Sequence, residues 1–147
     1  AIDFDFSNGN LKNGLFKNID GDGVDFSGSN VKLYDLNFEK IGDKAISAGE
    51  ESKIYIENIF IKDSKIGVAS KDSSDVKGNN VNIQNCEWYD YAVYKKKSYF
   101  NGATLDIKDS TGCNMSIVQK GSNFVYNYNK VPTKKFSVKK LYSGVKQ

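Results

Sequence analysis

The sequence contains no histidine and no arginine, and all 21 of its basic residues are lysines. Without histidine there is no Ser-His-Asp or Cys-His nucleophile, no histidine-bearing metal site, and no imidazole acid or base near neutral pH. Without arginine there is no bidentate fork for phosphate or carboxylate groups. The chemistry that remains belongs to carboxylates, lysines, tyrosines or a Ca²⁺ site, and we expect no cofactor.

Long apolar runs are also missing, since the longest extend over only a few of the 147 residues. A membrane-spanning helix needs about 18 or more consecutive apolar residues, so we expect no membrane span. The net charge of +3 is small beside 18 acidic residues, and the two signs are interspersed. We therefore expect that the chain does not bind nucleic acid, and its length of 147 residues fits a single domain.

Cysteine and proline are scarce. The single proline, Pro132, lies near the C-terminus, and the two cysteines, Cys86 and Cys113, are separated by a spacing typical of neither metal sites nor redox motifs. Two free thiols in the core are the simplest interpretation, with a disulfide as the alternative.

What the sequence does contain is an internal repeat of 22 residues. Apolar residues recur at this interval in several columns, the clearest being Ile2, Val24, Ile46 and Val68. One extra residue near Glu50 shifts the later columns, so that Val31 is followed by Ile54. We expect a longer coil over residues 73–80, after which the columns continue in Val81, Ile83, Cys86 and Trp88.

Each repeat alternates apolar and polar residues over a few positions and is broken by Gly, Asn, Asp or Ser. Examples are 31–33, 54–56 and 81–83. This pattern predicts an all-β fold, a parallel β-helix of about five to six coils with repeats of 22–27 residues and strands of three to five residues. The residues expected to be most buried are Val24, Phe26, Ile46, Ile56, Ile59, Val68 and Ile83.

A polar column accompanies the apolar ones. Asn and Asp tolerate left-handed backbone geometry, so a stack of them predicts a tight turn repeated in each coil. A row of ligand-binding amides is the alternative interpretation. The column consists of Asn13, Asp35, Asn58 and Asn85, with Asp109 as a further candidate.

The segments 23–29, 41–47 and 64–72 resemble the right-handed parallel β-helix repeats of the pectate-lyase-like superfamily, the carbohydrate-binding and sugar hydrolase type. The resemblance covers about residues 1–126. The stretch 92–98 is also similar to the C-terminal β-helix of some bacterial surface proteins with a spore coat protein H-like domain. That superfamily contains lyases, hydrolases, epimerases, adhesins and passive spacers, so its fold alone implies no single function.

Two functions are compatible with the resemblance. The chain is either a non-catalytic module for carbohydrate binding, attachment or spacing, or a fragment of a polysaccharide lyase, hydrolase or epimerase that uses clustered carboxylates. The missing histidine and arginine favour the non-catalytic module. The first repeat begins without a cap, which predicts a longer parent chain upstream, and the Asn-, Ser- and Lys-rich composition predicts a bacterial surface or secreted protein.

Carboxylates cluster near the N-terminus. The repeat places Asp25 beside Asp3 on the next coil, with Asp5 two residues farther along the same outward face. Opposed carboxylates about 5 Å apart could share a Ca²⁺ ion or a proton. A solvated acidic patch is the simplest interpretation, and a Ca²⁺ site or a catalytic pair are the alternatives.

The most unusual segment is 86–100, which contains the only tryptophan, a lysine triplet and four tyrosines. Aromatic faces and nearby polar groups are typical of sugar-binding surfaces. Alternatively, Trp88 fills an apolar column and the tyrosines cover a widened coil, or the segment is a protein interface. The candidate carbohydrate-binding residues are Trp88, Tyr89, Tyr91, Tyr94 and Tyr99.

The repeat stops near residue 127, and the Lys-rich segment 128–147 follows it. A solenoid must protect its last coil from edge-to-edge pairing. We therefore expect a β-helix over 1–127 and a capping tail over 128–147, with an anionic-surface-binding tail as the alternative.

Overall fold

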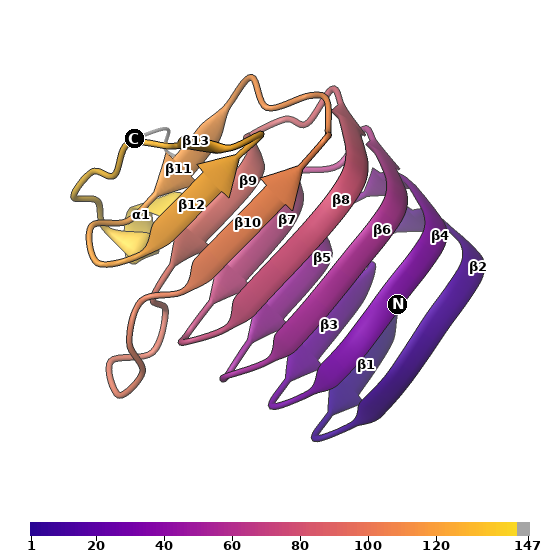
Figure 1. The fold of residues 1–147 in the computed structure, drawn as a ribbon, viewed down its shortest axis with the longest axis horizontal. Coiled ribbons are helices and arrows are strands. Elements are labelled where there is room, and N and C mark those ends of the chain that lie inside the picture. The colour runs from indigo at the N-terminus through magenta and orange to yellow at the C-terminus, as the bar shows by residue number, and fades with distance from the viewer. Residues whose placement is uncertain (144–147) are drawn as a thin grey trace.

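A computed structural model describes residues 1–143, which form thirteen β-strands and one short helix. The chain winds into a parallel β-solenoid of about six turns, as the sequence predicts (Figure 1). The first sheet contains, in spatial order, β1 (Ile2–Asp5), β3 (Val24–Ser27), β5 (Lys44–Gly49), β7 (Ile66–Lys71), β9 (Tyr89–Tyr94) and β11 (Ser116–Val118).

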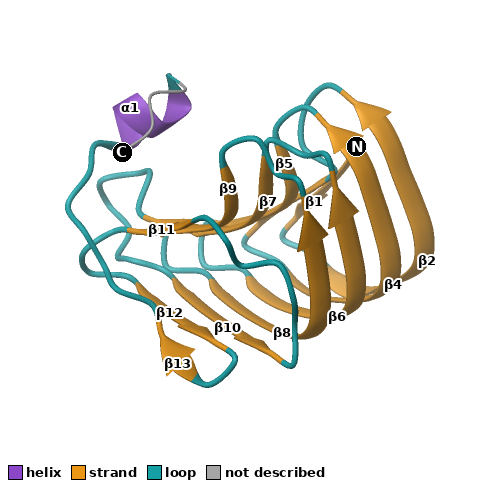
Figure 2. Cartoon of the chain, turned by 90° about the horizontal axis from the view of Figure 1, so that it is seen from above, coloured by secondary structure: helices purple, strands orange, loops and turns teal. Residues whose placement is uncertain are grey.

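The second sheet lies opposite the first, and the chain passes from one to the other twice in each turn (Figure 2). All its neighbouring strands are parallel except the last pair, β12 and β13. Its spatial order, starting from the C-terminal end, is β13 (Asn129–Lys130), β12 (Asn123–Tyr126), β10 (Thr104–Lys108), β8 (Asp75–Gln84), β6 (Lys53–Lys62), β4 (Asn30–Ile41) and β2 (Asn8–Ile19).

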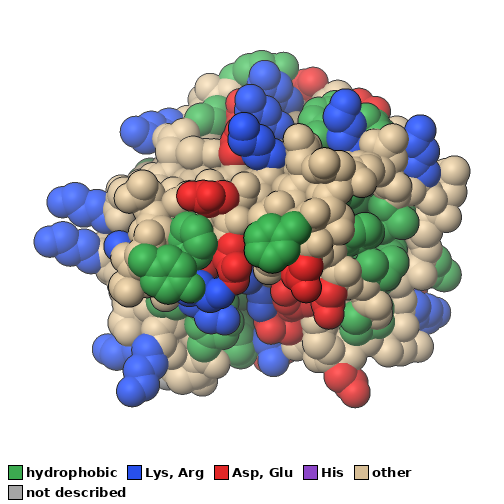
Figure 3. Space-filling view, turned by 90° about the horizontal axis from the view of Figure 1, so that it is seen from below, with side chains coloured by type: hydrophobic (Ala, Val, Ile, Leu, Met, Phe, Trp, Pro, Cys, Tyr) green, Lys and Arg blue, Asp and Glu red, His purple; other side chains and the backbone are tan. Residues whose placement is uncertain are grey.

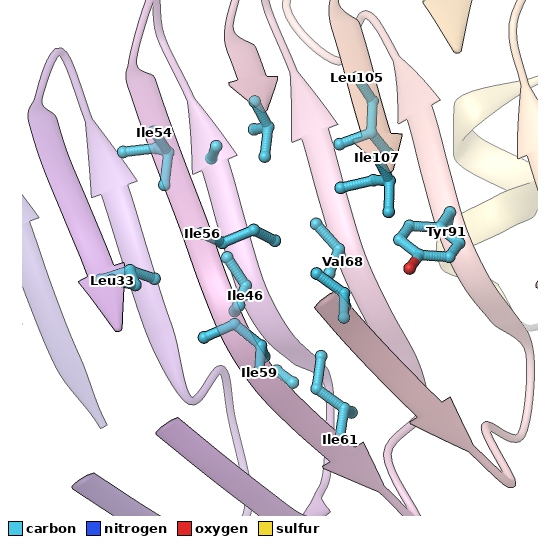
Figure 4. Packing of buried hydrophobic residues seen from close by; sticks show 14 of the residues in the cluster. Leu33, Ile46, Ile54, Ile56, Ile59, Ile61, Val68, Tyr91, Leu105 and Ile107 are labelled. Atoms are coloured by element: carbon cyan, nitrogen blue, oxygen red, sulfur yellow. The ribbon is translucent and has the colours of Figure 1, made fainter. Parts of the chain in front are cut away.

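Strand pairing confirms the 22-residue columns of the first four coils. Ile2 pairs with Val24, Val24 with Ile46, and Ile46 with Val68. Stacking of equivalent residues at the spacing of paired strands turns each apolar column into an interior ladder. All seven residues expected to be most buried are at most 2% exposed. Figure 4 shows Ile56 of the second sheet pointing inward towards the first sheet.

The strands of the second sheet are longer than expected. They reach 12 residues in β2 and β4, where the repeat predicted three to five. Each long strand combines two short alternating segments joined by a residue with positive φ, such as Asp35 (56°) or Asn58 (54°). The bend residue itself is left out of the ladder, but pairing resumes at the residue after it, and the chain therefore stays in one sheet where the sequence pattern suggested two strands.

The predicted polar column is correct at Asn13, Asp35, Asn58 and Asp109, but its fourth member is Asn80. Asn85 belongs to a second column of positive-φ residues, in which it donates a 2.6 Å hydrogen bond to Asp63 Oδ1. The structure therefore contains two stacked polar turns in each of the first coils.

The predicted position of the longer coil is wrong. β8 begins at Asp75, and Ile54 pairs with Val76, so the coil over 73–80 has no insertion. The extra residues lie in the following loop, over 95–103, and β10 consequently lies 29 residues after β8 and 19 before β12. These two spacings fall outside the expected 22–27 residues.

The strands β5, β7 and β9 are buried along their whole length. Their inward face packs in the solenoid core, and part of their outward face is covered by α1 (Val138–Tyr142). Leu141 of α1 is 2% exposed and packs against a second apolar cluster that includes Ile66, Tyr89 and Ile117. A sheet covered on both faces no longer needs alternating polar residues.

The C-terminal segment does pair with the last coil. β13 lies antiparallel on β12, and Lys134 joins the free edge of β11, donating through its backbone N–H to Val118 O at 2.9 Å. After Lys134 the chain continues into α1, which lies on the outer face of the first sheet. Residues 144–147 of the predicted tail lie outside the described residues.

The two cysteines are free thiols, with Cys86 buried and Cys113 half-buried. Cys86 therefore belongs to the core, as the core-thiol interpretation expected, whereas Cys113 only packs against it.

Over residues 1–143, the structure contains no helix long and apolar enough to cross a membrane.

Candidate functional site

The aromatic segment does not form one continuous surface. Tyr91 points into the solenoid core, where Figure 4 shows it near Val68 and Ile107. Its hydroxyl is buried with no hydrogen-bond partner, and burial raises the pKa of Tyr91 well above its usual value. Tyr91 therefore has no face available to a sugar.

Tyr89 and Tyr94 point outward from β9 but lie in the cluster beneath α1. The Tyr94 hydroxyl shares a 2.6 Å hydrogen bond with the Tyr142 hydroxyl. Tyr99 lies in the loop after β9, is 75% exposed and packs beside Phe100. The structure therefore separates the five candidate aromatic residues into the core, the cluster beneath α1 and an exposed loop.

Trp88 is half-buried at the edge of that cluster. It does not fill the column of Phe16, Phe38 and Ile61, because that position is taken by Ile83. The Lys65 ammonium lies over the indole, 4.6 Å from the ring centroid, and this cation–π contact connects Trp88 to the surface beside it.

The acidic candidates are placed as the repeat predicts, with Asp3 and Asp25 directly paired on β1 and β3 and Asp5 opposite Ser27. The nearest cation is Lys71 on β7, whose Nζ lies 4.0 Å from Asp25 Oδ1. Burial lowers the pKa of Lys71, and Asp25 partly offsets this effect. Among the described residues, no group of three or more His, Cys, Asp or Glu side chains could hold a metal ion.

A second ion cluster lies on the same outward face. Lys44 is 3% exposed, and its Nζ lies 2.7 Å from Asp43 Oδ2 and 3.2 Å from Asp22 Oδ1. Burial alone would lower the pKa of Lys44, but the two carboxylates outweigh burial and raise it. The Tyr142 ring lies 5.5 Å from the same ammonium. These contacts connect α1 to the solenoid and account for the burial of the lysine.

A groove of about 590 Å³ lies along one corner of the solenoid, and we call it the corner groove. It crosses the four turns that connect β2 to β3, β4 to β5, β6 to β7 and β8 to β9. Its lining carries both signs of charge together with amides, and consists of Asn18, Ile19, Asp20, Lys40, Ile41, Gly42, Asp63, Ser64, Lys65, Asn85 and Glu87.

The backbone explains why polar side chains line this groove. A residue with φ between 56° and 58° stands at or just before each of the four turns, and these residues are Asn18 and Lys40, near the ends of β2 and β4, and Asp63 and Asn85. These residues are stacked in successive coils by the strand register. The tight approach at Gly42, where an added Cβ would lie 2.2 Å from Asp20 O, keeps the turns closely nested.

Ser64 is a further polar residue of the groove lining. It is 1% exposed, and its Oγ has no hydrogen-bond partner in the described structure. The Ser64 Oγ is enclosed beneath the groove surface, so it is not a contact point for a ligand. Lys65 also lines the groove, and its ammonium lies over the Trp88 ring. The corner groove therefore combines one aromatic neighbour with side chains of both charge signs.

Sequence reasoning did not identify the corner groove. Its members are separated by 22 or 23 residues and become neighbours only when the coils stack. The signal available in the sequence was the column of Asn18, Lys40, Asp63 and Asn85, of which only Asn85 was singled out, in a different column.

No protein-family model matches the chain, and no match was found among curated proteins or solved structures. The parallel β-solenoid is therefore established by the structure, while the resemblance to the pectate-lyase-like superfamily and to the spore coat protein H-associated β-helix stays a prediction.

Proposed function

We propose that the chain is a non-catalytic β-solenoid module of a larger bacterial surface or secreted protein, and that it binds a polysaccharide along the corner groove. The observation that carries the proposal is the groove itself, which crosses four coils and is lined by side chains that can donate and accept hydrogen bonds. The bacterial surface location is supported by the Asn-, Ser- and Lys-rich composition.

The shape of the groove favours a chain-like ligand. Successive coils of a parallel solenoid repeat at the spacing of paired strands, so similar groups recur at a constant step along the groove. A polymer with its own repeating unit can use several of these steps at once, and weak contacts then add through multivalency.

The charges of the groove favour a neutral or mixed-charge glycan over a polyanion. Asp20, Asp63 and Glu87 outnumber Lys40 and Lys65 along the lining. A uniformly acidic polymer would meet repulsion from these carboxylates, whereas sugar hydroxyls can bond to both kinds of group. Trp88 lies beside the groove, but it is not a lining residue and the Lys65 ammonium lies over its ring.

The experiment is a glycan array that includes neutral, amino and acidic polysaccharides, followed by calorimetry with the best ligand. We expect Lys65→Ala and Glu87→Ala to weaken binding about tenfold each, because each removes charge-assisted hydrogen bonds to the sugar. The matched control is Lys130→Ala, an exposed lysine on β13 that does not line the groove.

Equal loss of affinity in Lys130→Ala would show that binding depends on net charge and would contradict a site in the groove. Binding to no member of the array would favour the spacer function. Turnover of an acidic polysaccharide that is lost in Asp25→Asn would favour the alternative lyase, hydrolase or epimerase.

A further inference from the structure

The two ends of the solenoid differ in how their sheet edges are covered. At the C-terminal end, β12 is paired with β13, and Lys134 bonds to the edge of β11. At the other end, β1 pairs only with β3 and β2 pairs only with β4. Figure 1 shows both end strands bordering the stack on the side away from α1. The backbone groups on the outer edges of β1 and β2 thus have no strand to bond to among the described residues.

The interior columns also reach this end without a cover. Ile2 is 37% exposed and Phe4 and Leu11 are half-buried, although their column neighbours Val24, Phe26 and Leu33 are at most 1% exposed. Phe4 stacks on Phe26 with ring centroids 5.1 Å apart. Its opposite ring face is turned to the end of the stack, so apolar area remains that one more coil would bury.

A serine ladder gives this end a direction. The backbone N–H of Ser7 donates to Ser29 Oγ at 3.0 Å, that of Ser29 to Ser52 Oγ at 3.1 Å, and that of Ser52 to Ser74 Oγ at 3.1 Å. Each hydroxyl therefore accepts from the coil before it. Ser7 Oγ donates to Asp5 O, and over residues 1–143 no N–H donates to it. The ladder ends on an open acceptor that a preceding parallel coil would fill.

We propose that the N-terminal face, defined as the free edges of β1 and β2 with Ile2, Phe4 and Leu11, is a stacking surface for one further parallel coil of the same 22-residue type in the same polypeptide. The coil would carry apolar residues over Ile2, Phe4 and Leu11 and a backbone N–H over Ser7. This inference rests on that part of the proposed function which makes the chain a module of a larger protein.

A second copy of the chain fits this face less well. The C-terminal end of a copy is covered by β13 and Lys134, so a head-to-tail stack is blocked. Two N-terminal faces related by a two-fold axis would pair antiparallel and would not continue the parallel bends of β2 and β4. Figure 3 shows another face of the molecule, on which side chains of both charge signs lie among hydrophobic ones.

The test adds a coil whose register is known. Residues 23–44, a complete repeat that the chain itself places between two others, are fused directly before Ala1 in the full chain. The matched control is the same fusion lacking one residue, Asp43, in the turn just before Ala1, because this deletion slips the whole added strand by one residue against β2 and turns alternate side chains to the wrong face. Hydrogen exchange of the β2 amides is compared in the unmodified chain and in both fusions.

We expect the in-register fusion to slow exchange of β2 amides by about tenfold or more and to raise the thermal midpoint, and the slipped fusion to do neither. Equal exchange in both fusions would overturn the proposal. Protection of β2 in the unmodified chain that grows with concentration, together with a dimer mass, would identify a second copy as the occupant and would also overturn it. Glycan binding is measured separately, so either proposal can fail alone.

Discussion

The side-chain amide of Asn58 donates a hydrogen bond to Asp35 Oδ1 on the preceding coil, with a length of 3.0 Å. Asn58 also accepts one from the amide of Asn80 on the following coil, at 2.8 Å. All three residues have positive φ and stand where a long strand bends. The same side chains therefore permit the bend and join successive bends to one another.

The first prediction concerns this ladder. Asn58→Ala should lower the free energy of unfolding by about 2 kcal/mol, because alanine is strained at positive φ and both hydrogen bonds are lost. Asn58→Gly loses the same bonds but adopts the backbone without strain, so it should cost about 1 kcal/mol less. Urea unfolding measures both. Equal costs for the two variants would show that backbone strain contributes nothing at this bend.

The second prediction concerns Gly78, which occupies an interior column beside Ile56 and Ile107. An added Cβ would lie 2.6 Å from Ile56 Cγ1 and 2.8 Å from Ile107 Cδ1. Gly78→Val should therefore destabilise the fold by about 1–3 kcal/mol through overpacking. Gly21→Val is the control, since no atom lies within 4 Å of the added Cβ there. A stabilised Gly78→Val variant would reveal unfilled space in the core.

The third prediction is a pH dependence. Burial raises the pKa of Cys86 to about 12 and that of Cys113 to about 11, from an ordinary value of 9.0. Above pH 9 the unfolded chain releases these protons and the folded chain retains them, so the stability present below pH 9 declines as pH rises through 11 and 12. We expect the free energy of unfolding to fall between pH 8 and pH 10.

The double variant Cys86→Ala/Cys113→Ala tests the cause of this decline. It should be less stable at pH 8, because burial of the thiols is lost, but it should lose less stability between pH 8 and pH 10 than the unmodified chain. An identical slope in both proteins would assign the alkaline decline to other groups, such as the buried tyrosines Tyr91 and Tyr94.

The fourth prediction concerns Asp25, the nearest carboxylate to the buried Lys71. Asp25→Asn should lower stability at pH 7 by up to about 1 kcal/mol, because the ammonium loses its partner while the carboxylate is partly screened by water. The penalty should shrink towards pH 10, where the lowered pKa of Lys71 allows it to become neutral in the fold. Asp3→Asn, at an exposed position, is the control.

Thermal melts with and without millimolar Ca²⁺ complete this test. We expect the same midpoint in both conditions for the unmodified chain. A rise with Ca²⁺ that disappears in Asp25→Asn would support the Ca²⁺ site formed by Asp3, Asp5 and Asp25, and with it the enzymatic alternative.

The apolar column of Ile2, Val24, Ile46 and Val68 could be predicted from the sequence because its spacing is constant and each of its positions is filled by a large apolar residue. The register was lost after residue 73 because Gly78 leaves one interior position without a side chain, so the alternating pattern disappears for one strand. The next strong apolar residues, Val81 and Ile83, were consequently placed in the columns of Ile54 and Ile56. In the structure they pair with Ile59 and Ile61, five residues farther along the coil.

The candidate sites were harder to predict for a different reason. Tyr89 and Tyr94 resemble an exposed aromatic surface in the sequence, and they are buried in a cluster with Ile66, Ile117 and residues of the C-terminal segment, including Leu141, about 50 residues later. The corner groove is formed by turn residues whose side chains carry no local signature, since each turn contributes only a few of them. Both features depend on contacts between segments that are distant in the sequence.

The strands β5, β7 and β9 are buried on both faces, whereas β1 and β2 are largely exposed. In a linear stack of this kind each coil is stabilised mainly by its two neighbours, so cooperativity weakens towards an end that has only one. We expect the central coils to form the folding nucleus and β1 and β2 to melt first. Heating should therefore shorten the ordered stack from its N-terminal side before the centre unfolds in a single cooperative step.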